Sequence, residues 1–344
     1  PSSNMAVYRP AGAPFNHESA DVILRTTDDV DFRVHKGILA IASPFFSDMF
    51  ALGQGATDRP LTTKVQPEEQ EGNLQVVPML EENSEVLDKL LRLCYPVPAP
   101  DNKALDELTP VLAAALKYQL EHAAERLKSD LVSPRFMRDE PLRVFAIARR
   151  YNLDKETTAA IPHVLRQGLP GPYVDELKYI PASAIHRLWE VRRRATSLAA
   201  SLASDFQWLT NNKAINRTWV FFLCTVCAAS DVTIAIDGRE IRPRAWWKEY
   251  MRRAEQALRE TPAGSVVTSS TVLWPSFKAM GTCATCGSGR GVDDLREFSE
   301  IFAARIDRTI MEVCASSIPI TIPNLLTDES MAFHMQIADG TKWD

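Results

Sequence analysis

The sequence predicts an α+β protein whose strands lie in the first third of the chain and whose remainder is mainly helical. Three observations lead to this prediction. Apolar residues alternate with other residues along 22–34, as in paired strands with one buried face. From residue 84 onward they recur at helical spacing. A length of 344 residues, 45% of them hydrophobic, is enough to bury a core without disulfides and suggests about two domains.

The turn residues set the order of elements in the first third. Residues 1–18 are rich in Pro, Ala, Ser and Asn, so we expect a flexible tail. A hairpin follows over 22–34. Ser43 and Pro44 predict a helix start, because Ser caps free N–H groups and Pro lacks one. That helix would have an apolar face of Phe45, Phe46, Met49 and Phe50. Residues 51–73 read as a long polar insert.

A strand over 74–79, a helix over 84–94 and one broad helical face over 108–131 complete a first domain of residues 19–131. Residues 132–200 show helical spacing only and predict a helical segment. Its last helix begins at Pro181 and is expected to bury Trp189.

A change in composition predicts a separate C-terminal domain over 201–325, followed by a tail over 326–344. Six of the seven tryptophans lie after residue 200, which indicates an aromatic core of its own. Helices are expected over 245–259 and 294–314. Asp294 and Glu297 have the spacing of a capping box, so the second helix is predicted to begin there.

Charge and cysteine content exclude several classes of protein. The net charge of −5 and the pI of about 5.8 argue against a dedicated nucleic-acid binder. The longest apolar run, residues 219–229, is shorter than the roughly 18 residues of a membrane span. Six cysteines are too few for a disulfide scaffold of this length. We therefore expect an intracellular protein of the cytoplasm or nucleus that does not bind membranes.

Three stretches of the first domain resemble the BTB/POZ domain. They are Asp21–Leu24 with Phe32–Phe50, Val86–Pro96, and Ala113–Tyr118. The resemblance covers about residues 19–131, and the whole chain is similar to BTB-domain proteins of mushroom-forming fungi that have a cysteine-containing C-terminal region. It implies a helix cluster flanked by a short sheet, binding to protein partners, frequent homodimerisation and no catalytic activity.

The resemblance also implies which residues make contacts. An acidic residue at Asp21 and a basic residue at Lys36 form a charged pair near the dimer interface of the family. Some members join substrates to cullin-type ubiquitin ligases, and the helix over 45–50 lies where such contacts are made. The expected interaction residues are Asp21, His35, Lys36, Phe45, Phe46, Met49 and Phe50. His35 is more simply a histidine that specifies the fold, and the phenylalanines are more often core than contact surface.

Two C-x-x-C pairs, Cys224/Cys227 and Cys283/Cys286, are the residues with the most distinctive chemistry. Each pair can present two thiolates to one tetrahedral ion, so we expect the four to share a structural zinc. The 55 residues between them, 228–282, exceed the spacing of a simple zinc ribbon. Unligated reduced cysteines and a redox-active pair remain alternatives, although no thioredoxin-like pattern surrounds either pair. The glycine-rich residues 287–291 suggest a flexible turn after ligation.

These observations favour a self-associating scaffold with a zinc-stabilised C-terminal domain. One alternative is a substrate receptor of a cullin-type ubiquitin ligase. Another is a zinc-containing regulator associated with nucleic acid, although the balanced charge between the cysteine pairs makes this partner the less favoured one. An enzyme is not expected, because the sequence contains no coherent triad, carboxylate pair or open metal site.

Overall fold

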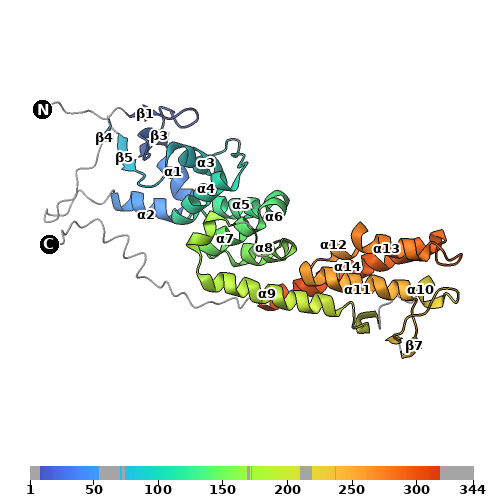
Figure 1. Ribbon diagram of the computed structural model, residues 1–344. Helices are drawn as coiled ribbons and strands as arrows, with labels where there is room; N and C mark the ends of the chain where they lie inside the picture. Colours follow the sequence, from blue (N-terminus) through green and yellow to red (C-terminus); the bar gives the residue numbers. More distant parts are fainter. Residues whose placement is uncertain are drawn as a thin grey trace. The chain divides into compact units, whose positions relative to one another are not determined.

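The computed structural model describes residues 8–53, 70–71, 74–168, 171, 173–209, 219–236 and 238–317. They form two compact units (Figure 1). The first contains the described residues up to Ala160 and Val174–Ile180, and the second contains those of Ile161–Tyr173 and Pro181–Asp344. The predicted helical segment, 132–200, is therefore divided between the two units. No helix among the described residues combines the length and apolar character needed to cross a bilayer.

The first unit contains a five-stranded sheet with the order β1-β3-β2-β5-β4. Its strands are β1 (Arg9–Pro10), β2 (Val22–Arg25), β3 (Val30–Val34), β4 (Gln70–Glu71) and β5 (Leu74–Pro78). β2 and β3 pair antiparallel with Leu24 opposite Phe32, which confirms the predicted hairpin. β5 lies parallel to β2 on its other side. The prediction of a single buried face is wrong, because β2 is the central strand and is buried on both faces.

The N-terminal segment is folded where it is described. β1 pairs parallel with β3, and the Phe15 side chain is fully buried between Phe32 and Tyr95, at ring-centroid distances of 5.8 and 5.4 Å. The prediction of a flexible tail over 1–18 is therefore wrong for residues 8–18. Composition alone misled here, since one large aromatic side chain is enough to anchor a Pro- and Ala-rich segment.

Helices make up most of the rest of the first unit. They are α1 (Lys36–Ala42), α2 (Pro44–Gly53), α3 (Ser84–Cys94), α4 (Leu105–Lys117), α5 (Glu121–Leu131), α6 (Pro134–Asp139), α7 (Pro141–Arg150) and the start of α8 (Asp154–Arg166), with a 3-10 turn η1 (Asp175–Tyr179). The single helical face expected over 108–131 is two helices. Gln119 has a φ of 51°, a left-handed conformation that ends α4 and lets the chain turn into α5.

The predicted cap of α2 is present. Ser43 is fully buried, and its Oγ accepts a hydrogen bond from the Phe46 backbone N–H at 3.1 Å. The same hydroxyl donates to the Tyr118 carbonyl at 2.5 Å, which ties α2 to the end of α4. Ser43 therefore stabilises both a helix end and a tertiary contact.

We expect Ser43→Ala to lower the free energy of unfolding by about 1–3 kcal/mol, because it removes a cap and leaves the buried Tyr118 carbonyl without this donor. Ser47→Ala, on the exposed side of the same helix, is the matched control and should change stability by less than about 0.5 kcal/mol. Chemical denaturation of both variants measures the difference. Equal effects would contradict the assigned role of Ser43.

The second unit is mainly helical. Its elements are the end of α8, α9 (Ala182–Ser201), η2 (Gln207–Leu209), α10 (Val220–Leu223), β6 (Ile234–Ile236), β7 (Arg239–Ile241), α11 (Ala245–Glu260), α12 (Gly264–Val267), α13 (Ser270–Met280) and α14 (Gly289–Ser317). α9 packs against both α11 and α14 (Figure 1). The core contains the fully buried rings of Trp219, Phe221, Trp247, Tyr250, Phe298 and Phe302. This confirms the aromatic core expected in the last third of the chain.

Two expectations for this unit are wrong. α14 begins at Gly289, so Asp294 is not its cap; its buried carboxylate instead accepts the Val220 backbone N–H at 2.8 Å, at the start of α10. Trp189 was expected to face inward but is 52% exposed. The helix predicted over 245–259 is confirmed as α11. The tail over 326–344 and most of the polar insert, 54–69 and 72–73, lie outside the described residues.

Candidate metal centre

The four cysteines of the two C-x-x-C pairs lie together in the second unit. Cys224 directly follows α10 and Cys227 lies in the turn beyond it, while Cys283 and Cys286 occupy the turn between α13 and α14. Their sulfur atoms all lie within 4.8 Å of one another. The long intervening segment therefore brings the second pair back to the first, and the prediction that the pairs converge is confirmed.

The distances between the sulfur atoms fit tetrahedral coordination of one metal ion. Cys224 Sγ and Cys283 Sγ are 3.8 Å apart, far beyond a disulfide bond, and all four cysteines are free. With Zn–S bonds of about 2.3 Å, a regular tetrahedron places its sulfurs about 3.8 Å apart. Three of the side chains are buried and Cys227 is partly exposed. The four thiols can thus enclose one metal ion near the surface of the unit.

The two pairs have the same hydrogen-bond pattern. The Cys227 backbone N–H points at Cys224 Sγ, and the Cys286 N–H points at Cys283 Sγ, each at 3.4 Å. The Cys286 N–H lowers the pKa of the Cys283 thiol to about 6. Burial opposes ionisation of Cys224, but the N–H groups of Cys227 and Val226 lower its pKa. Both turns therefore favour the thiolate, which is the form that binds metals.

For the second cysteine of each pair, burial is the largest effect and opposes ionisation. It raises the pKa of Cys227 to about 11 and also raises that of Cys286. Four thiolates this close would repel one another without a cation, so a metal ion that binds here displaces protons. Thiolates are soft ligands suited to zinc, and four of them leave no coordination position for a substrate. The donor set fits a structural metal.

Glycines allow α14 to approach the second pair closely. A Cβ on Gly287 would lie 2.8 Å from the Cys283 carbonyl oxygen, and one on Gly291 would lie 1.9 Å from the Cys286 carbonyl oxygen. The residues expected to form a flexible turn instead include the first turn of α14, which begins at Gly289. Glycine is therefore required here for steric reasons, because a side chain at position 291 would clash with the Cys286 carbonyl and displace α14 from the cysteine turn.

The interaction residues expected in the first unit are partly core residues. Phe46 and Phe50 are 2% and 6% exposed, Met49 is partly exposed, and Phe45 is 38% exposed. Of the three phenylalanines, Phe45 alone has a surface that a partner can contact directly. The hypothesis of a cullin-binding aromatic face therefore cannot depend on the Phe50 ring in this conformation.

The remaining expected residues stabilise the start of α1. The Asp21 carboxylate accepts the Lys36 backbone N–H at 2.7 Å, whereas the Lys36 ammonium donates to Gln75 Oε1 at 2.9 Å. The His35 ring lies between Ser19 Oγ, 3.0 Å from Nε2, and the Tyr95 hydroxyl. Its hydrogen bonds support the interpretation of His35 as a histidine that specifies the fold.

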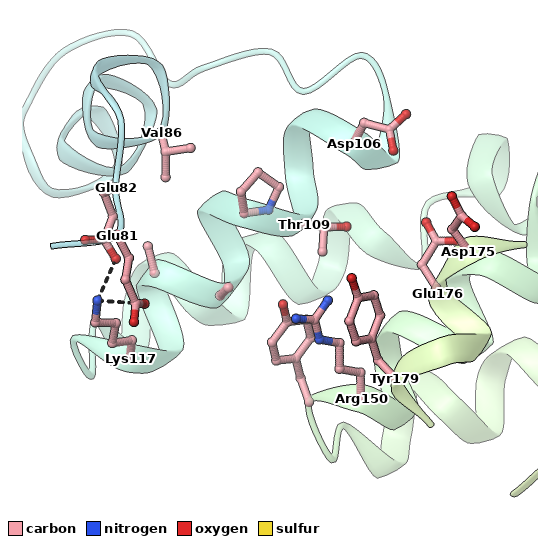
Figure 2. Close-up of a pocket in the computed structure, with 14 residues that line it drawn as sticks. Glu81, Glu82, Val86, Asp106, Thr109, Lys117, Arg150, Asp175, Glu176 and Tyr179 are labelled. Carbon is pink, nitrogen blue, oxygen red and sulfur yellow. Dashed lines mark hydrogen bonds and ion pairs between the residues drawn. The ribbon is translucent and has the colours of Figure 1, made fainter. Parts of the chain in front are cut away.

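A pocket of about 560 Å³ in the first unit was not expected from the sequence (Figure 2). Its acidic lining is compensated by basic side chains. Glu81 and Glu82 both pair with Lys117 at 3.0 Å, and Arg143 pairs with Asp106 and Glu176. These residues come from four separate stretches of the chain and form no local motif, so no sequence signal could have identified the pocket. Its internal pairing indicates a structural network.

The first unit combines a five-stranded sheet with a cluster of helices. Residues 13–134 match the family model of the BTB/POZ domain, so this part of the chain is a BTB/POZ domain. The match begins before residue 19, in agreement with the burial of Phe15. BTB/POZ domains mediate protein–protein interactions and are typically not enzymes. No curated protein matches the chain, so the resemblance to fungal proteins with a cysteine-containing C-terminal region stays a prediction.

Proposed function

We propose that the protein is an interaction scaffold that self-associates through its BTB/POZ domain and holds a structural zinc ion in its second unit. The observation that carries the first part is the BTB/POZ match over residues 13–134. The observation that carries the second is the cluster of four sulfur atoms within 4.8 Å. The zinc would act through folding energy rather than catalysis, because four thiolates fill its coordination shell.

Exposed apolar side chains on α1 and α2 support self-association. Ile41 on α1 is 90% exposed, Leu52 on α2 is 80% exposed, and the two helices pack against each other. Large exposed apolar side chains on neighbouring elements are typical of protein interfaces. Two copies of the same surface can meet around a two-fold axis, the commonest symmetry of homodimers.

We expect Ile41→Glu to weaken self-association at least tenfold, because it would bury a carboxylate in the apolar interface. Light scattering coupled to size-exclusion chromatography measures the mass, which is 38.4 kDa for one chain. Leu80→Glu, also at a side chain that is 80% exposed in the same domain but outside both helices, is the control and should leave the dimer intact. A wild-type protein that stays monomeric at tens of micromolar would refute the proposed self-association.

A further inference from the structure

Arg244 places a positive charge beside the first cysteine pair. Its Nη1 donates to the Cys227 carbonyl and its Nη2 to the Arg242 carbonyl, both at 2.9 Å. Within the part of the chain that is described, no carboxylate forms an ion pair with this half-buried guanidinium. An unpaired charge removed from water costs free energy, so a compensating negative charge nearby would stabilise it.

Trp246 places a buried donor beside the second pair. It is 7% exposed, and its buried indole N–H has no hydrogen-bond partner among the described residues. Its ring centroid lies 5.9 Å from that of Phe221, three residues before Cys224, and its indole opposes the rise in the pKa of the Cys286 thiol that burial causes. A neutral thiol is a weak acceptor, whereas a metal-bound thiolate accepts an N–H hydrogen bond well.

Both residues lie at the start of α11, which is fixed against the first pair. The Arg244 N–H donates to the Phe221 carbonyl and the Ala245 N–H donates to the Ala228 carbonyl, both at 2.9 Å. A divalent ion with four thiolates has a net charge of −2, so it would compensate the guanidinium and provide an acceptor for the indole N–H.

We propose that Arg244 and Trp246 are positioning residues of the metal centre, which offset its negative charge and thereby set its zinc affinity. The inference rests on the proposed zinc site. Arg244 acts through charge next to Cys227, and Trp246 acts through a hydrogen bond to the Cys286 thiolate. Outer-sphere partners of this kind change metal affinity by about 10–100-fold when they are removed.

The test uses the full chain and zinc itself, with affinity measured by competition against a chromophoric chelator. Trp246→Phe and Arg244→Gln should each weaken zinc binding by about 10–100-fold, and Arg244→Lys should recover most of the loss by restoring the charge. In cobalt-substituted protein, Trp246→Phe should also shift the thiolate-to-cobalt charge-transfer band, because the sulfur loses a hydrogen bond.

Trp247→Phe is the matched control, since Trp247 is adjacent, fully buried and also has an indole N–H without an acceptor among the described residues. It should leave the cobalt spectrum unchanged. Wild-type affinity in both Trp246→Phe and Arg244→Gln would overturn the inference. So would equal losses of affinity in Trp246→Phe and Trp247→Phe with no spectral change, which would indicate packing alone. A wild-type chain that binds no zinc would overturn the metal site as well as the inference.

Discussion

Replacing Cys283 with serine is expected to abolish stoichiometric zinc binding and to unfold the second unit. Cys283 is central to the cluster, because its sulfur lies 3.8 Å from Cys224 Sγ and accepts the Cys286 N–H. In small peptides structural zinc supplies on the order of 10 kcal/mol of folding energy at pH 7. That is comparable to the whole stability of a typical domain, about 5–15 kcal/mol, so loss of most of it should leave the unit largely unfolded.

Elemental analysis and thermal unfolding test this expectation together. Wild-type protein should contain one zinc per chain, and removal of that zinc with a chelator should reproduce the instability of Cys283→Ser. Cys314→Ser is the matched control, because Cys314 is 1% exposed but lies on α14 outside the cluster. It should keep its zinc. Wild-type zinc content in Cys283→Ser would show that the four sulfurs do not share an ion.

The sequence predicts the four cysteine ligands of this centre but not the residues that surround them. C-x-x-C spacing is local, and each pair forms a turn with the same N–H-to-sulfur contact, so both halves of the ligand set could be recognised. Their convergence depends on the packing of the helices between them. Arg244 and Trp246 have no local motif at all, because their proximity to the sulfurs arises only where α11 begins against the first turn.

The same distinction explains the successes and errors in the fold. The β2–β3 hairpin and the Ser43 cap involve residues close in sequence, and both are present. Asp294 and Glu297 predicted the wrong start for α14, because a three-residue spacing occurs inside any helix as well as at its start. What decides the role of Asp294 is a contact with Val220, 74 residues away. Burial of Phe15 also depends on distant partners, and the composition of its surroundings cannot reveal it.

The aromatic core beside the metal centre is the second feature whose loss should be severe. Phe298 on α14 is fully buried, and its ring centroid lies within 6.3 Å of six others. These rings belong to Trp208, Trp219, Phe221, Trp247, Tyr250 and Phe302. Phe221 lies three residues before Cys224, so this cluster also holds the first cysteine pair in place.

We expect Phe298→Ala to lower the free energy of unfolding of the second unit by about 3–5 kcal/mol, because it removes buried apolar surface and leaves a cavity among rigid rings. Zinc affinity should fall with it, since the cavity loosens the support of Phe221. Trp274→Ala is the control, because that ring is 68% exposed on α13 and should contribute less than about 0.5 kcal/mol. Denaturation followed by tryptophan fluorescence measures both. A loss below about 1 kcal/mol for Phe298→Ala would mean that the core relaxes around the missing ring, and that the metal centre does not depend on it.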